Sequence, residues 1–421
     1  MGVLAKIKKY QRVIANFFSL SLINGISHIL ALFTVPYLIR VLGIDNYGAY
    51  TFMYVLAQYM LLAGNYGFKF SVTRQVSVFR DDKRKISTIF NATIFARLFI
   101  TLLVIILGLI FVTIFLNGDD LLMYLFAFGI VFGDIFIPTW LFQGMEEMRY
   151  LTIVNVISKF VFAVLIFIFI KQPADYVYVI LLNSLGYIAA GIFSTWIAVK
   201  HFGLHFAIPR ISDVKSQFKD GWHIFVSNIG MELYRNSNVF LLRVFVGETA
   251  VGIFGSIEKL VKAAQSILNA LPQAFFPYVS RKFYSGNAKN NVVALERLLK
   301  WAFLLLFAVA VVFVCSPKLI SIYLALDYDI VKYLVWLLAP VLLFGCLNYI
   351  IGIVGLVNMG ASDKFQRNIW ITAATSVTFM LLFCREYSYY AAAIAWTWAE
   401  FILFVLCYRS VWNIKHRKEV A

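Results

Sequence analysis

The feature that most constrains this chain is its succession of long apolar segments. About twelve such runs follow one another, each bounded by charged or turn-forming residues. A helix of about 20 apolar residues rises about 30 Å, the thickness of the hydrocarbon core of a bilayer. The sequence therefore predicts twelve transmembrane helices, at roughly 13–39, 46–68, 86–116, 121–144, 151–170, 176–199, 220–246, 249–278, 299–316, 330–358, 366–384 and 388–410.

The amino-acid composition also favours a membrane protein. The chain is 62% hydrophobic and only 14% charged, with a mean hydropathy of +0.83. Soluble globular proteins are about half apolar and about a quarter charged, so these values exclude that class. The basic and then apolar N-terminus lacks a small-residue cleavage site, and its apolar run continues to about Leu38, so we interpret it as a membrane helix and not as a signal peptide. The four cysteines have no paired or metal-like spacing and are expected to be free thiols.

The net charge of +16 reflects topology. With the N-terminus in the cytoplasm, most Lys and Arg residues fall in the inner loops, for example at 6–12, 80–85 and 281–300. The outer turns at 117–120 and 325–329 are acidic or neutral. This bias follows the positive-inside rule and predicts that both termini are cytoplasmic. No nucleic-acid partner is expected.

Two stretches reveal an internal repeat. LIRVLGIDNYGAY (38–50) resembles LLRVFVGETAVGIF (241–254), which aligns Arg40 with Arg243 and Gly48 with Gly252. The repeat predicts two six-helix bundles of the same orientation, an arrangement found in transporters that bind substrate between their halves. The expected parts are a cytoplasmic N-terminus (1–12), a first bundle (13–199), a connecting loop (200–219), a second bundle (220–410) and a cytoplasmic tail (411–421).

Charged residues inside the predicted helices mark candidate functional positions, because charge in a bilayer is costly and usually faces an interior. Asn228, Glu232 and Arg235 fall within one arc of about 100° on the helix 220–246. On the next helix, a second polar stripe also predicts a water-filled lumen. The further candidates are Glu258, Lys259 and Lys262 of that stripe, and Arg97, Asp134, His28, Gln58, Lys159 and Glu400 on other helices.

Each charge also has a structural explanation. Glu258 and Lys262 are spaced to pair on one helix face. Glu232 and Arg235 are close enough in sequence to form a static pair. Basic residues near the inner interface can extend their head groups toward water. This applies to Arg97 and Lys159, while Asp134 and His28 could serve helix contact or proton binding, and Glu400 is expected to be structural.

The net positive charge of the side chains expected to line the lumen favours an anionic substrate. Without Lys159 and Glu400, four basic residues face three acidic ones. Lys and Arg bind phosphate groups strongly where the dielectric constant is low. We assign Arg97, Arg235, Lys259 and Lys262 to a diphosphate, and Asp134, Glu232, Glu258, His28, Gln58 and Asn228 to ion coupling or to the polar lining. No phosphate loop, metal cluster or nucleophile–base pair is visible, so we expect neither enzymatic activity nor a cofactor or metal.

Four motifs resemble one family. RVLGIDNYGAYTF, GNYGFKFSVTRQVS, QGMEEMRYLTI and LPQAFFPYVSR are similar to the polysaccharide transporter family, specifically the Wzx-type O-antigen flippases of the MATE-like MOP superfamily. They occur in the expected order along essentially the whole chain. One departure is Asn65, where many relatives carry an acidic residue. A coupling role borrowed from the family is therefore unsupported at this position.

The resemblance implies an all-α integral membrane protein, a V-shaped MATE-like transporter of two six-helix bundles. It implies that an undecaprenyl-diphosphate-linked oligosaccharide moves from the inner to the outer leaflet of a bacterial inner membrane, driven by ion antiport. An O-antigen polymerase and a chain-length regulator would be partners of a monomeric transport unit. A multidrug/proton antiporter and a non-transporting assembly scaffold remain as alternatives, and O-antigen, capsule and common-antigen units remain open as cargo.

Overall fold

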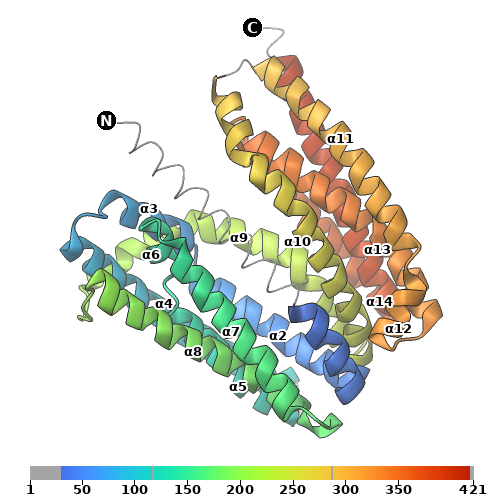
Figure 1. Ribbon diagram of the computed structural model, residues 1–421, viewed down its shortest axis with the longest axis horizontal. Coiled ribbons are helices and arrows are strands. Elements are labelled where there is room, and N and C mark those ends of the chain that lie inside the picture. Colours follow the sequence, from blue (N-terminus) through green and yellow to red (C-terminus); the bar gives the residue numbers. More distant parts are fainter. Residues whose placement is uncertain (1–29, 116–117, 286–287, 418–421) are drawn as a thin grey trace. The chain divides into compact units, whose positions relative to one another are not determined.

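The computed structural model describes residues 30–115, 118–285 and 288–417. Within these ranges every regular element is helical and there is no β-strand (Figure 1). Seven of the described helices are long and apolar enough to cross a membrane. They confirm the all-α class and indicate a multi-pass membrane protein. These candidate spans are Lys83–Ile114, Asp119–Gly144, Met148–Phe169, Pro173–Phe202, Val292–Val314, Tyr328–Val357 and Ser362–Ile414.

The last of these spans covers two of the predicted helices. The element α14 runs from Ser362 to Arg417, and its helical geometry is interrupted at Ser388, where φ is 51° and ψ is −131°. The interruption falls where the sequence predicts that the segment 388–410 begins. Three other predicted spans also fall on helices, but these helices are not among the seven; they are 46–68, 220–246 and 249–278. The number of twelve crossings therefore stays a prediction.

The chain divides into two compact units. Unit 1 comprises residues up to Thr34 together with Val41–Ile229, and unit 2 comprises Val35–Arg40 together with residues from Gly230 onward. The boundary lies inside α9 (Ile211–Phe245). A short helix, Leu30–Leu42, contributes residues to both units.

Unit 1 is built around α5. Its helices are α2 (Ile44–Asn65), α3 (Phe68–Val78), α4 (Lys83–Phe115), α5 (Asp119–Ile135), α6 (Thr139–Gly144), α7 (Met148–Phe169), η1 (Pro173–Asp175) and α8 (Tyr176–Phe202). The α5 helix packs against α8, α2 and α4. A Cβ atom at Gly133 would lie 2.5 Å from the backbone of Tyr187 on α8, and one at Gly129 would lie 2.6 Å from Ser184. The two glycines therefore permit the close helix approach typical of membrane bundles.

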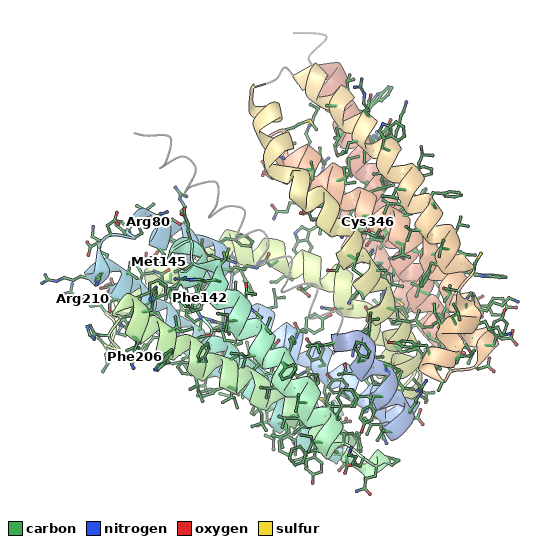
Figure 2. All side chains as sticks on the ribbon, in the orientation of Figure 1. Arg80, Phe142, Met145, Phe206, Arg210 and Cys346 are labelled. Atoms are coloured by element: carbon green, nitrogen blue, oxygen red, sulfur yellow. The ribbon has the colours of Figure 1, made fainter. Side chains whose placement is uncertain are left out.

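Unit 2 is built around α13. It contains α10 (Glu248–Ser285), α11 (Ala288–Val314), α12 (Pro317–Leu324), α13 (Tyr328–Tyr349), the π-helix η2 (Ile350–Val357) and α14. The α13 helix packs against α10, α11 and α14, and its apolar side chains form much of the buried core. Cys346 belongs to that core (Figure 2). All four cysteines are free thiols, as predicted.

In each of the two stretches aligned by the predicted repeat, a glycine lies between the end of one helix and the start of the next. Gly43 has φ 82° and Gly247 has φ 124°, a region that residues with a Cβ atom rarely adopt. The aligned arginines have different partners. Arg40 donates to the carbonyl oxygens of Ile322 and Tyr323 at 3.3 Å, whereas Arg243 pairs with Glu248 at 2.6 Å. The internal repeat stays a prediction.

Candidate functional site

The first polar cluster lies inside unit 1, around Arg97 of α4. The guanidinium is 2% exposed and donates to the Oδ2 atom of Asp134 at 2.5 Å. It also donates to the Oδ1 atom of Asn65 at 3.0 Å and to the backbone oxygen of Ile135 at 3.0 Å. The Nδ2 atom of Asn65 donates to the same Asp134 oxygen at 3.2 Å. These three side chains form one hydrogen-bonded group, the Arg97 cluster.

The Arg97 cluster joins three helices. Asn65 is the last residue of α2, and Asp134 and Ile135 are the last two residues of α5. A cation at a helix C-terminus stabilises the carbonyl groups that lack partners there. Asp134 neutralises the guanidinium, and the attraction between the two charges offsets the free-energy cost of removing them from water. In this state Arg97 is occupied by protein groups, and its assignment to a diphosphate stays a prediction.

Two more predicted positions lie in unit 1. The Nζ atom of Lys159 on α7 lies 5.3 Å from the centre of the Tyr187 ring on α8, a cation–π contact between neighbouring helices. The Nε2 atom of Gln58 on α2 is buried without a hydrogen-bond partner among the described residues. Neither side chain is part of the Arg97 cluster.

The second polar cluster lies inside unit 2 and connects α9 with α10. The Nζ atom of Lys262 lies 2.9 Å from the Oε1 atom of Glu258 and donates to the Oδ1 atom of Asn236 at 3.4 Å. Asn236 in turn donates to the Oε2 atom of Glu232 at 2.6 Å. Trp396 of α14 completes the group, with its ring centre 6.0 Å from the Lys262 nitrogen. We call these five residues the Lys262 cluster.

The Lys262 cluster differs from a fully buried ion pair because its lysine is partly accessible to solvent. The side chain of Lys262 is 36% exposed, while that of Glu258 is 6% exposed. An ammonium group has three donors, and the two described bonds use two of them. The pairing of Glu258 with Lys262 was predicted from their spacing and is confirmed by the distance. A lysine in this setting can exchange one acceptor for another without leaving its place in the fold.

The remaining predicted residues are distributed as follows. Lys259 lies on α10, one residue beyond Glu258, and is partly buried. Asn228 is partly buried on α9 and belongs to unit 1, so the predicted stripe on this helix crosses the unit boundary. The side chain of Arg235 and the whole of His28 lie outside the described residues.

One buried polar pair was missed by sequence reasoning. Asn348 of α13 donates to the Oε2 atom of Glu400 at 2.7 Å and to its backbone oxygen at 2.8 Å. Both side chains are buried, which supports the structural role predicted for Glu400. Asn348 is a lone amide in an apolar run, and nothing in its spacing links it to a residue 52 positions later. Among the described residues there is no group of three potential metal ligands.

Two of the motifs that carry the family resemblance pack against each other in unit 1. The motif GNYGFKFSVTRQVS contains all of α3 except its last residue, and α3 contacts α6, in which the motif QGMEEMRYLTI begins. Ser77 donates to the backbone oxygen of Gly144 at 3.4 Å, and a Cβ atom at Gly144 would lie 2.6 Å from Val76. Arg80 and Glu146 form an ion pair at 3.1 Å beside this contact, and Figure 2 labels Arg80 there with Phe142 and Met145. The two motifs therefore meet at one packed contact in unit 1.

Residues 13–283, well over half of the chain, match the family described as polysaccharide biosynthesis protein. The chain belongs to this family. The match confirms the resemblance drawn from the motifs. As a member of the polysaccharide biosynthesis protein family, the chain is similar to two bacterial proteins named "Putative O-antigen transporter". The Escherichia coli (strain K12) protein is 27% identical over 87% of this chain and 88% of its own length, and that of Shigella dysenteriae is 26% identical over 75% and 78%.

This family member shares its fold with solved structures of other membrane proteins. The lipid II flippase MurJ, in an inward closed conformation, superposes with a TM-score of 0.71 at 13% identity, covering 98% of this chain and 91% of MurJ. An inward-facing multidrug resistance MATE transporter gives 0.68 at 15% identity, covering 92% and 99%. Its outward-facing counterpart gives 0.62 at 14% identity, covering 95% of each chain.

Proposed function

We propose that this chain is a flippase that moves an undecaprenyl-diphosphate-linked oligosaccharide, an O-antigen or related repeat unit, from the inner to the outer leaflet of the bacterial inner membrane. It works by alternating access and is coupled to an ion. The observation that carries this proposal is the similarity to the two O-antigen transporter relatives along most of the chain. The fold that the chain shares with MurJ supports it.

The Lys262 cluster is our candidate for the diphosphate contact. Lys262 is partly exposed and has a donor beyond its two described bonds. Lys259 and Arg235 would add positive charge, since a diphosphate carries more charge than one ammonium group can neutralise. Trp396 limits the space on the α14 side of the ammonium. Arg97 would take part only in a state in which its bonds to Asp134 and Asn65 are broken.

Glu258 gives the same cluster a means of coupling. In the described state its carboxylate holds the Lys262 ammonium at 2.9 Å. A proton or another cation at Glu258 would remove this competitor and leave Lys262 available to the diphosphate. Cation binding and substrate binding would then favour each other reciprocally. This sign of coupling moves ion and substrate in the same direction and differs from the antiport that the family resemblance implies. Glu232 and Asp134 are further candidates for the coupling ion, and His28, Gln58 and Asn228 for the polar lining.

The cellular arrangement follows from the same proposal. Both termini would be cytoplasmic, because that orientation places most basic residues on the inner side. The two six-helix bundles at 13–199 and 220–410, joined by the loop 200–219, would form a V-shaped transporter that acts as a monomer and is no enzyme. The polymerase and the chain-length regulator of the polymer would be its partners.

The test is genetic complementation combined with a transport assay. A strain that lacks the gene receives Lys262→Ala or the wild type, and surface polymer and the amount of protein in the membrane are measured. We expect the variant to accumulate normally and to fail in polymer formation. In vesicles reconstituted with a labelled lipid-linked sugar, the wild type should expose the sugar on the opposite leaflet and the variant should not.

Two other functions predict different results. A multidrug/proton antiporter, favoured by the MATE superpositions, would change drug tolerance when deleted and leave the polymer intact. An assembly scaffold would restore polymer in cells and show no translocation in vesicles. Either result would overturn the flippase proposal.

A further inference from the structure

A cavity unrelated to either polar cluster lies in unit 2, between the two parts of α14 that Ser388 separates. Its volume is about 380 Å³. Arg367 and Ile371 line it from the first part, one helical turn apart, and Arg409 and Asn413 line it from the second. Two arginines from separate helical segments therefore converge on one small space.

The floor of this cavity is fixed by hydrogen bonds. Asn368 is 1% exposed, and its amide donates to the Oγ atom of Ser410 at 3.1 Å and to the Sγ atom of Cys407 at 3.6 Å. Ser410 is 6% exposed and donates to the backbone oxygen of Leu406 at 2.8 Å. These bonds join the two helical segments below the arginines, so the positions of Arg367 and Arg409 are set by packed residues.

The two arginines are exposed at the rim. Among the residues that the structure describes, no carboxylate forms an ion pair with either of them. Asp363, one turn before Arg367, is exposed as well and does not bridge to it. A guanidinium presents five donors in a planar fork, a geometry that matches phosphate oxygens. Two such groups over a polar floor form a site for one phosphate.

The surroundings of the cavity place it at the level where a membrane meets water. Tyr408 and Trp412, on either side of Arg409 in sequence, are 41% and 49% exposed. Exposed Tyr and Trp mark the interfacial level of membrane helices. Ile371 and Val405 are also exposed and provide an aliphatic surface next to the rim. A bound molecule would therefore meet guanidinium groups at one end and hydrocarbon at the other.

We propose that this cavity binds the phosphate-bearing headgroup of an anionic phospholipid, with the phosphate between Arg367 and Arg409 and an acyl chain along Ile371. Basic pockets between membrane helices are suited to anionic headgroups. A zwitterionic headgroup is disfavoured, since its quaternary ammonium would lie close to two positive charges. Inorganic phosphate offers the same oxygen atoms but gains nothing from the aliphatic surface. The site requires only that α14 spans the membrane, and it is independent of the proposed transport and of Lys262.

The test uses the purified full-length chain in a neutral detergent. Thermal unfolding is followed while dioctanoyl phosphatidylglycerol, dioctanoyl phosphatidylcholine or inorganic phosphate is added at equal concentrations. The variants are R367Q/R409Q and the charge-matched control K300Q/K318Q, which removes two positive charges from exposed positions elsewhere in unit 2. R367K/R409K keeps the charge and loses the fork. Because all the substituted residues are exposed, unfolding without lipid should be unchanged.

We expect phosphatidylglycerol alone to raise the unfolding temperature of the wild type and of the control. R367Q/R409Q should bind it at least about tenfold more weakly, the effect of losing roughly one net charged hydrogen bond, and R367K/R409K should lie between. An equal response of R367Q/R409Q to phosphatidylglycerol would overturn the site. An equal response of the wild type to inorganic phosphate would overturn the lipid assignment. The proposed lipid site does not depend on Lys262, so the transport activity of Lys262→Ala does not bear on the outcome of these binding measurements.

Discussion

The Arg97 cluster of unit 1 and the Lys262 cluster of unit 2 are both ion pairs inside predicted membrane helices, but they are built differently. Arg97 is bonded to a carboxylate, an amide and a backbone carbonyl, and its partners are the ends of two other helices. Lys262 is bonded only to side chains and has a third of its surface exposed. A charge that holds helix ends together serves the fold, whereas one held loosely by side chains can exchange partners.

The largest effect is expected at Arg97. Arg97→Met leaves the partly buried carboxylate of Asp134 without its cation, which costs up to about 3–5 kcal/mol of folding stability. We expect little full-length protein in the membrane, measured by quantitative blotting and by thermal unfolding of the remainder. Normal accumulation would show that the Arg97 cluster is no structural element and would remove the contrast with Lys262.

A smaller loss is expected at Asn65. Asn65→Ala removes one hydrogen bond to each of two charged groups and leaves their direct bond intact. Hydrogen bonds to charged groups are worth about 1.5–3 kcal/mol each, and water at the partly exposed Asp134 should replace part of this. Thermal unfolding should place the variant between the wild type and Arg97→Met. A destabilisation as large as that of Arg97→Met would mean that the amide, and not the ion pair, holds the helix ends.

The Lys262 cluster should show the opposite pattern. Lys262→Ala should lower stability by less than Arg97→Met does, because water can reach the place of the partly exposed ammonium, although the buried carboxylate of Glu258 is left without its cation. It should nevertheless abolish translocation in reconstituted vesicles. Lys262→Arg, as the matched variant, should retain part of the activity because it keeps the charge. A large loss of unfolding temperature in Lys262→Ala would contradict the assignment of this lysine to substrate.

The smallest effect on stability is expected for Glu258→Gln. The neutral amide mimics a protonated carboxyl group and should free Lys262 from its strongest competitor. Binding of a short-chain lipid diphosphate should become tighter than in the wild type, and net translocation should slow because the release step is lost. The measurements are equilibrium binding by fluorescence and single-turnover translocation. Unchanged binding of the lipid diphosphate would show that Glu258 does not take part in the coupling.

Sequence reasoning succeeded where the signal is local. Runs of about 20 apolar residues define the spans directly, and the spacing of Glu258 and Lys262 predicts their bond because both lie on one helix face. Sequence reasoning assigned Arg97 and Lys262 to the same role in diphosphate binding, because both are basic residues in apolar helices. Their different surroundings result from tertiary packing. The partners of Arg97 are 32 and 37 residues away on other helices, and Trp396 reaches Lys262 from α14, so no periodicity encodes these contacts.

The interaction between Arg97 and Asp134 also bears on how the protein is made. The ribosome delivers α4 before α5, so Arg97 reaches the membrane before its counter-charge exists. A central arginine opposes insertion of a helix by about 2.5–3.5 kcal/mol on biological scales, while the residues of α4 that follow it are strongly apolar. The α4 helix can therefore enter on its own hydrophobicity, but its charge is neutralised only when α5 follows. The two helices are best regarded as one unit of membrane biogenesis, completed when the carboxylate of Asp134 arrives.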